Sequence, residues 1–248
     1  MSDEPTNFAP YFAGRSLSPQ ADAELMHRAQ RLRYEVYCQE CGFLPQEAYP
    51  DGRETDEHDA RAAHFCALDR RLQMAGYVRL VSADAQGRFP FQDHCATLFD
   101  DAALPAPGEA GEISRLMVHP QYRRRRGDTL AGVTVLQEAA PQVERRNDSP
   151  QIMLCMFRQM YQHSLAAGTR YWYAAMERPL ARALVRLGFA FEPIGPETDY
   201  YGPVAPYLAD LRQLELKVGE AKPDLLNWMR APLPQLRVRS TRFSPGAH

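Results

Sequence analysis

Charged residues occupy several positions in the first half of the chain where the surrounding pattern predicts apolar side chains. Arg33 lies beside the apolar stripe of a predicted helix, and Arg79 lies inside the strand-like run at residues 76–81. Glu112 and Arg115 lie in a second hydrophobic run. A charge removed from water costs several kcal/mol unless it is paired and hydrogen-bonded, so each of these residues needs a partner of opposite sign.

The acidic loop at residues 44–61 offers such partners, because it carries Glu54, Asp56 and Asp59 in the pattern ExDxxD. The planar guanidinium of arginine binds carboxylates through two parallel hydrogen bonds. Taken singly, Arg33 could instead extend from a helix edge into solvent, and ExDxxD could be a solvated loop or a cation site. Taken together, the charges predict one pocket.

The segments that must position these charges alternate between helical and strand patterns. Ser18-Pro19 is a helix start signal, and this helix is expected to reach Cys41 and end at Gly42. Strands are predicted at residues 64–68, 74–81, 112–118, 171–176, 189–191 and 199–204, and further helices at 149–168, 178–187 and within 207–230. This order predicts one mixed α/β domain at residues 18–210. We expect a flexible N-terminus at 1–17, and a helical extension with a mobile tail at 211–248.

The composition is that of an ordinary globular protein and excludes several functions. The 248 residues are 45% hydrophobic and 24% charged, with a net charge of −2, so no overall field favours nucleic acid. No apolar run approaches the ~20 residues that span a bilayer, and no signal segment is evident, so we expect a cytoplasmic protein. The glycine motifs of nucleotide sites and GxSxG are missing, which leaves dinucleotide, nucleotide and hydrolase functions without support.

Cys38 and Cys41 form a CxxC pair, which raises the question of a zinc or redox site. A structural zinc site would need a second pair of ligands at similar spacing, and the sequence offers none. A redox pair would stand at the start of a helix, where the thiol pKa is lowered, whereas this pair falls at a helix end. We therefore expect structural cysteines and no metal, and keep a zinc or redox protein as an alternative.

The order and spacing of the charges resemble a known signature. The series Arg33, ExDxxD at 54–59, Arg79 and EISR at 112–115 is similar to that of acyl-homoserine-lactone (autoinducer) synthases and of N-acyl amino acid synthases. Longer stretches resemble the acyltransferases associated with the PEP-CTERM/exosortase system; these are residues 31–44, 54–65, 112–125, 171–184 and 188–202. The likeness covers most of residues 25–210.

This resemblance implies a fold, a reaction and a set of site residues. The fold would be GNAT-like, with a mixed, largely antiparallel twisted sheet, a splayed central strand pair and flanking helices. The enzyme would move a long-chain fatty acyl group from an acyl carrier protein or coenzyme A thioester to the amine of a small acceptor, such as an amino acid, without a bound cofactor. The implied catalytic residues are Glu112, Ser114 and Arg115, and the implied substrate-binding residues are Arg33, Glu54, Asp56, Asp59 and Arg79.

The chemistry of aminolysis assigns Glu112 as the general base, directly or through one water. A backbone N–H near residues 116–118 would stabilise the oxyanion, and Arg115 and Arg79 are candidates for binding a carboxylate of the acceptor. In a regular strand Glu112 and Arg115 point to opposite faces, because their separation is odd. Both can reach one site only if a bulge interrupts the strand; otherwise Arg115 is a structural partner of the acidic loop.

The site that binds the acyl donor is expected just after the strand predicted at residues 112–118. The candidates for binding the donor or its carrier are Val118, Arg123, Arg124, Arg125 and Arg126. Residues 118–124 resemble the stretch before the pyrophosphate-binding loop of GNAT acetyltransferases, but the expected Gly-x-Gly does not follow. This favours an acyl carrier protein, whose acidic surface would meet the arginines; a solvated basic loop explains the run equally well.

Two other functions stay open at this point. A homoserine-lactone synthase would use S-adenosylmethionine as the acceptor. A non-catalytic GNAT-fold module would bind acyl thioesters without reacting them, although the complete charge set argues against it.

Overall fold

One twisted sheet runs through the computed structural model, which describes residues 6–123 and 149–233. Its strands follow the order β1-β2-β3-β4-β5-β8-β6, with β7 paired to β8. Their bounds are β1 Phe12–Leu17, β2 Ala62–Asp69, β3 Met74–Val81, β4 Ala110–Val118, β5 Tyr171–Met176, β6 Glu192–Pro193, β7 Thr198–Asp199 and β8 Pro203–Asp210. Neighbouring strands are antiparallel except β4 and β5, which are parallel.

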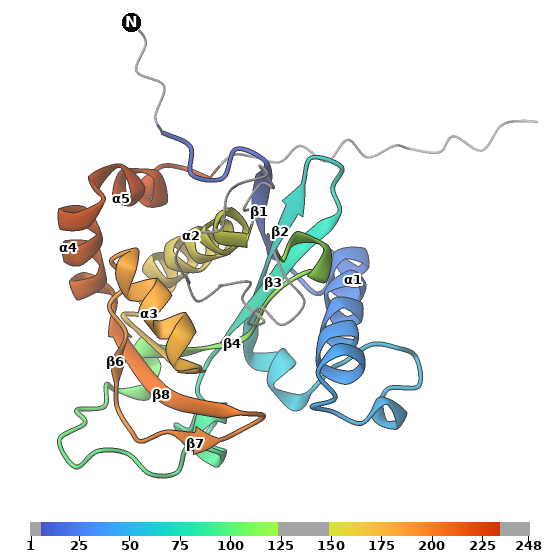
Figure 1. Cartoon of the computed structure of the whole chain (residues 1–248), viewed down its shortest axis with the longest axis horizontal. Coiled ribbons are helices and arrows are strands. Elements are labelled where there is room, and N and C mark those ends of the chain that lie inside the picture. The colour runs from blue at the N-terminus through green and yellow to red at the C-terminus, as the bar shows by residue number, and fades with distance from the viewer. Residues whose placement is uncertain (1–5, 124–148, 234–248) are drawn as a thin grey trace, which may run out of the picture.

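Helices cover both faces of this sheet (Figure 1). Their bounds are α1 Ala23–Tyr34, α2 Ser149–Ala167, α3 Arg178–Arg186, α4 Leu211–Ala221 and α5 Pro223–Arg230. Side chains alternate along β2, so Phe65 joins the core beneath α2, whereas Cys66 joins the core beneath α1. The α1 core contains Met26, Ala29, Leu32 and Val36, which share one helix face. The predicted mixed, largely antiparallel sheet is confirmed.

The central strands β4 and β5 separate after a short paired stretch. Only Ala110–Glu112 pairs with Tyr171–Tyr173. Beyond this point β4 continues to Val118 and β5 to Met176 without pairing to each other. The two strands therefore form a V whose closed end lies at Glu112. This is the splayed strand pair that the resemblance implied.

The N-terminal part of the chain is more ordered than the sequence suggested. Residues 12–17 form the edge strand β1, so the prediction of a flexible segment up to residue 17 was wrong there. The predicted helix start at Ser18 was also wrong, because the chain first turns and the helix begins at Ala23. The carboxylate of Asp22 accepts from the Ser18 backbone N–H and binds Arg15, which ties this turn to β1.

The bounds of the other helices and strands agree with the sequence patterns in some places and differ in others. The first helix continues through a π-helical segment, Glu35–Glu40, and ends at Gly42, which has a φ of +64°. Strands were predicted at 189–191 and 199–204, but the strands lie at 192–193, 198–199 and 203–210. Residues 207–210, predicted as helix, belong to β8, and α4 starts at Leu211, where the helical extension was expected. Among the described residues, no helix is long and apolar enough to cross a bilayer.

The packing of β1 on α2 can be tested at Gly14. A Cβ added at Gly14 would lie 2.8 Å from the Cys155 carbonyl oxygen and 2.7 Å from Cγ of Gln159. We expect Gly14→Ala to lower the free energy of unfolding by about 1–3 kcal/mol, because the backbone of α2 would have to move. Gly108→Ala is the matched control, since no atom lies within 4 Å of its added Cβ. Equal stability of the two variants in urea titrations would contradict this packing.

Candidate active site

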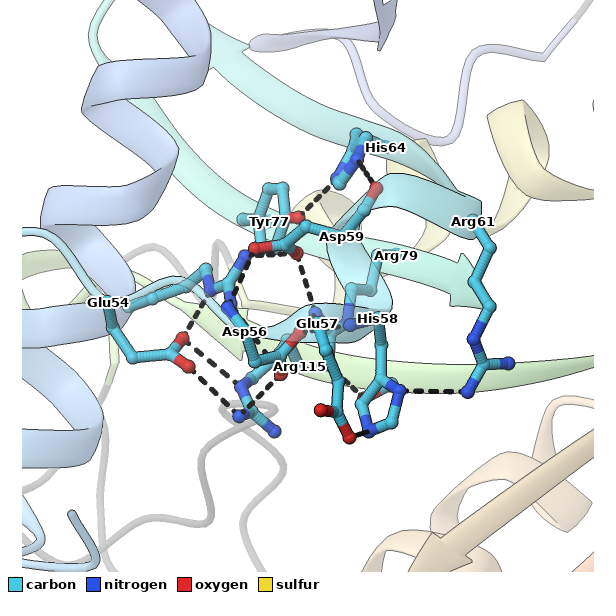
Figure 2. A network of polar contacts seen from close by, with 12 residues as sticks. Glu54, Asp56, Glu57, His58, Asp59, Arg61, His64, Tyr77, Arg79 and Arg115 are labelled. Carbon is cyan, nitrogen blue, oxygen red and sulfur yellow. Dashed lines mark hydrogen bonds and ion pairs between the residues drawn. The ribbon is translucent and has the colours of Figure 1, made fainter. Parts of the chain in front are cut away.

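The acidic loop and the three arginines meet in one network, which we call the charge network and define as Arg33, Glu54, Asp56, Asp59, Arg79 and Arg115 (Figure 2). Arg33 comes from α1, the carboxylates from the loop before β2, Arg79 from β3 and Arg115 from β4. Three guanidinium groups thus face three carboxylates. The predicted convergence is confirmed for these six residues, but it was wrong for Glu112, which accepts from the Phe91 backbone N–H and forms no ion pair with an arginine of the described residues.

Each carboxylate of the charge network binds two guanidinium groups. Glu54 binds Nε of Arg33 and lies 3.0 Å from Nη2 of Arg115. Asp56 accepts from both terminal nitrogens of Arg79, at 2.5 and 2.7 Å, and from Arg115 at 3.1 Å. Asp59 accepts from Nη1 of Arg33 at 2.7 Å and from Nη1 of Arg79 at 2.6 Å. No member can be removed without leaving an opposite charge short of a partner.

The conformation of the loop is fixed by its own backbone bonds. Asp56 accepts from the His58 backbone N–H at 3.0 Å, and Asp59 accepts from the Asp56 backbone N–H at 3.1 Å, which forms a capping box at the start of the 3-10 helix Glu57–Arg61. His64 bridges the Tyr77 hydroxyl, at 2.6 Å, and the Asp59 carbonyl oxygen, at 3.2 Å. These bonds aim both aspartates at the arginines.

Burial makes this network costly to disturb. The side chains of Arg33, Arg79 and Glu54 are 0% exposed. Burial opposes ionisation of Glu54, but hydrogen bonds from Arg33 and Arg115 hold its pKa below the ordinary value. Burial likewise opposes ionisation of Asp56 and Asp59, and their bonds to the arginines hold the pKa of each below the ordinary value. All three carboxylates are therefore ionised at neutral pH.

A bulge in β4 brings Arg115 into the network. Arg79 pairs with Ser114 and Tyr77 with Met117, so Val78 opposes both Arg115 and Leu116. Arg115 has a φ of +54°, a left-handed conformation that residues other than glycine rarely adopt. The bulge that Glu112 and Arg115 would need to reach one site is present. Arg115 reaches the acidic loop through it and also borders the cavity described below.

Glu112 lies at the closed end of the V and is only 5% exposed. Its Oε2 accepts from the Phe91 backbone N–H at 2.8 Å. Burial raises the pKa of Glu112 to about 7, although this hydrogen bond and the positive charge of Arg79 act in the opposite direction. A carboxylate with this pKa exists in both protonation states near neutral pH, as a general base requires.

A cavity of about 320 Å³ opens beside Glu112, between the splayed strands. One part is polar, where the charge network reaches it through Asp56, Arg79 and Arg115. Another part is apolar and is lined from four elements by Ile113, Leu116, Phe157, Met176, Leu180 and Leu184. The cavity can therefore hold a polar group next to Glu112 and an apolar chain between the strands and helices.

The predicted site residues divide into two groups. Glu112, Ser114, Arg115, Asp56 and Arg79 line the cavity. Arg33, Glu54 and Asp59 lie behind them and reach it only through their ion pairs. Their geometry is that of positioning residues.

Several cavity residues were not singled out from the sequence. Aromatic rings form one side of the opening, where His94 stacks on Tyr200 with ring centres 3.7 Å apart and Phe43 stacks on Tyr201 at 5.0 Å. His58 also lines the cavity and lies 2.8 Å from Nη2 of Arg61. These residues come from loops without periodic pattern, so only the position of His58 inside ExDxxD could have drawn attention to it.

The predicted donor-binding residues are only partly described. Val118 is buried and pairs with Gly76. Arg123 binds Glu40, at 2.9 Å from Nη1 and 2.5 Å from Nη2. Arg124, Arg125 and Arg126 lie outside the described residues.

The CxxC pair lies in the π-helical segment and at its end. Cys38 is buried, Cys41 is partly buried, and both thiols are free. Burial raises the pKa of both thiols, which disfavours a reactive thiolate. Within residues 6–123 and 149–233, no group of three His, Cys, Asp or Glu side chains is placed to hold a metal ion.

The charge network can be tested through Glu54. We expect Glu54→Gln to lower the free energy of unfolding by about 3–5 kcal/mol at pH 7, because Arg33 and Arg115 would lose the charge that both contact. The pKa of Glu54 is lowered by folding, so its contribution is present above about pH 4.3 and is lost in acid. The difference in the free energy of unfolding between Glu54→Gln and wild type should therefore become smaller below about pH 4 in urea titrations.

Glu47→Gln is the matched control, because Glu47 lies in the same loop and is exposed. It should change stability by less than about 0.5 kcal/mol. A Glu54→Gln protein as stable as this control would refute the interlocked network.

Comparison with known proteins agrees with this geometry. Residues 32–132 match the model of the acetyltransferase (GNAT) domain. The solved structure of BjaI, described as a CoA-dependent acyl-homoserine lactone synthase with SAM and isopentyl-CoA, has a TM-score of 0.58 at 18% identity and covers 85% of this chain and 89% of its own. No curated protein sequence matches the chain significantly.

Two further solved structures share the fold. The AHL synthase LasI has a TM-score of 0.56 at 15% identity, covering 84% of this chain and 92% of its own. FeeM, an N-acyl amino acid synthase from uncultured soil microbes, has a TM-score of 0.53 at 15% identity, covering 85% and 96%. Identities this low establish the fold alone. The chain thus has the GNAT fold, and over residues 32–132 it is similar to the acetyltransferase (GNAT) domain.

Proposed function

We propose that this protein is an N-acyltransferase that moves a long-chain fatty acyl group from a carrier thioester to the amine of a small acceptor, such as an amino acid. The observation that carries the proposal is the cavity, in which the buried carboxylate of Glu112 lies beside an apolar space between splayed strands. Aminolysis needs a base for the amine, a donor for the oxyanion and room for the acyl chain.

The proposed roles follow from position. Glu112 takes the proton of the attacking amine, and its pKa of about 7 suits this task. A backbone N–H of β4 beyond Glu112, near residues 116–118, stabilises the oxyanion, because β5 does not pair with that part of β4. Ser114 lies 3.4 Å from Nη2 of Arg79 and keeps a hydroxyl at the cavity wall.

The arginines differ in how they could meet an acceptor. The side chain of Arg79 is 0% exposed, and Asp56 and Asp59 occupy its terminal nitrogens. Arg115 is 13% exposed and borders the cavity with its guanidinium 4.7 Å from the centre of the Tyr37 ring. Arg115 is therefore the better candidate for an acceptor carboxylate, and Arg79 serves to hold the acidic loop.

The donor is proposed to be an acyl carrier protein thioester, with coenzyme A as the alternative. The missing Gly-x-Gly supports the first. The likeness to BjaI, a CoA-dependent synthase whose structure contains isopentyl-CoA, supports the second. A place in PEP-CTERM/exosortase biology rests on the sequence resemblance.

A homoserine-lactone synthase is the runner-up, and the structural likeness to such synthases favours it. Incubation of the protein with palmitoyl-acyl carrier protein or palmitoyl-coenzyme A, together with pooled amino acids or S-adenosylmethionine, separates the candidates by product mass. We expect an N-palmitoyl amino acid. A homoserine lactone would select the runner-up, and an intact thioester in every mixture would favour a binding module.

The role of Glu112 predicts a kinetic defect. We expect Glu112→Gln to lower kcat/KM by about 10²–10⁴-fold, because an amide cannot accept the proton. The wild-type rate should rise with pH through an apparent pKa of about 7, and the variant should lose that rise. Glu109→Gln, an exposed neighbour, serves as the control. An unchanged pH profile in Glu112→Gln would show that another group is the base.

The same carboxylate predicts a change in stability. Folding raises the pKa of Glu112 from about 4.3 to about 7, so the native state holds a proton that the unfolded state releases between these values. The contribution of Glu112 to stability therefore falls as the pH rises from about 4.3 to about 7. We expect Glu112→Gln to remove this fall, and to be more stable than wild type at about pH 8 in urea titrations. A less stable variant at that pH would contradict the raised pKa.

A further inference from the structure

Glu177 is a second carboxylate of the cavity wall, and the described residues give its side chain no hydrogen-bond or ion-pair partner. The other carboxylates at this wall are occupied, since Glu112 accepts from Phe91 and Asp56 binds two arginines, while Asp93 binds Arg88. Glu177 precedes α3, yet its side chain makes no capping hydrogen bond to that helix. Its carboxyl group is therefore available to a ligand in the cavity.

The strand register places Glu177 at the open end of the V. Glu112 pairs with Tyr173, and Glu177 follows Tyr173 by four residues, directly after Met176, the last residue of β5. At about 3.3 Å per residue, Glu177 lies about 13 Å along β5 beyond the residue that pairs with Glu112. Leu116 lines the cavity as well. Glu112 and Glu177 thus mark opposite ends of the splayed part of the cavity.

The reaction also needs a proton donor for the leaving sulfur, a task that Glu112 does not perform. The proposed oxyanion donor lies near residues 116–118, beyond Glu112 towards the open end of the V, so the thioester carbonyl and its sulfur belong in the cavity between Glu112 and Glu177. When the carbon–sulfur bond breaks, the sulfur carries a negative charge in a partly buried site, which is unfavourable without a proton. Burial raises the pKa of Glu177, which increases the fraction that carries a proton.

We propose that Glu177 is the general acid that protonates the departing thiolate, an inference that rests on the proposed function. The amine nitrogen attacks the carbonyl carbon and forms the carbon–nitrogen bond, while the electron pair of the broken carbon–sulfur bond stays on sulfur. Glu112 takes one proton from the amine, and Glu177 gives one proton to the sulfur. The products are an amide and a thiol, and exchange with water returns both carboxyl groups to their starting states.

The histidines and arginines at the wall are less suited to this task. His58 is bound to Arg61, and His94 is stacked on Tyr200. Arg79 and Arg115 are held by the carboxylates of the charge network and give up no proton at neutral pH.

The test compares two donors that differ only in the leaving group. Palmitoyl-acyl carrier protein releases an alkyl thiolate that needs a proton, whereas the palmitoyl ester of thiophenol releases a stable aryl thiolate. With the carrier donor and pooled amino acids, we expect Glu177→Gln to lower kcat about 100-fold. With the aryl thioester, the variant should approach the wild-type rate. Glu112→Gln should be slow with both donors.

Glu197→Gln is the matched control, because Glu197 lies outside the cavity and pairs with Arg178 on the first turn of α3. Thermal unfolding verifies that each variant is folded. Equal defects of Glu177→Gln with both donors would overturn the inference and indicate a role in binding the acceptor. A wild-type rate with the carrier donor would overturn it as well. Failure of the wild-type protein to form product with either donor would instead refute the proposed function.

Discussion

The mutual neutralisation of three arginines and three carboxylates is the constraint on which the site depends. Arg33, Arg79 and Glu54 are fully buried, and each needs an opposite charge within hydrogen-bond distance. Their partners come from α1, the acidic loop, β3 and β4, so the ion pairs join elements that are far apart in sequence. Such a network fixes geometry more than it adds stability, since replacing buried ion pairs by apolar groups is often neutral or stabilising elsewhere.

The charge network and the separation from β5 both involve strand β4. Arg115 reaches Glu54 because a bulge interrupts β4, and just before that bulge β4 parts from β5 at Glu112. The ion pairs of Arg115 hold the unusual backbone conformation of this residue in place. One end of the cavity is thereby anchored to the acidic loop, whereas its other wall is formed by β5 and α3. The polar and apolar parts of the cavity follow from this division.

Much of this arrangement could be predicted from residues whose types conflict with their surroundings. Arginine inside a strand demands partners, so the ion pairs were accessible from the sequence, whereas the odd spacing of Glu112 and Arg115 left two alternatives, one with a bulge and one without. Glycine and proline marked the end of the first long helix and the starts of α2 and α3. The edge strand β1 was missed because its residues, FAGRSL, show no clear alternation. The aromatic residues at the cavity opening (Phe43, His94, Tyr200 and Tyr201) and Glu177 were missed. They come from loops and turns, and only tertiary contacts bring them to the cavity.

A double-mutant cycle between Arg79 and Asp56 measures how strongly the charge network couples its members. The free energies of unfolding of Arg79→Met, Asp56→Asn and the double variant give the coupling between the two side chains. We expect a coupling of about 1–3 kcal/mol, because the bidentate pair is largely buried and each partner alone would leave a charge uncompensated. Effects that add to within about 0.3 kcal/mol would contradict it.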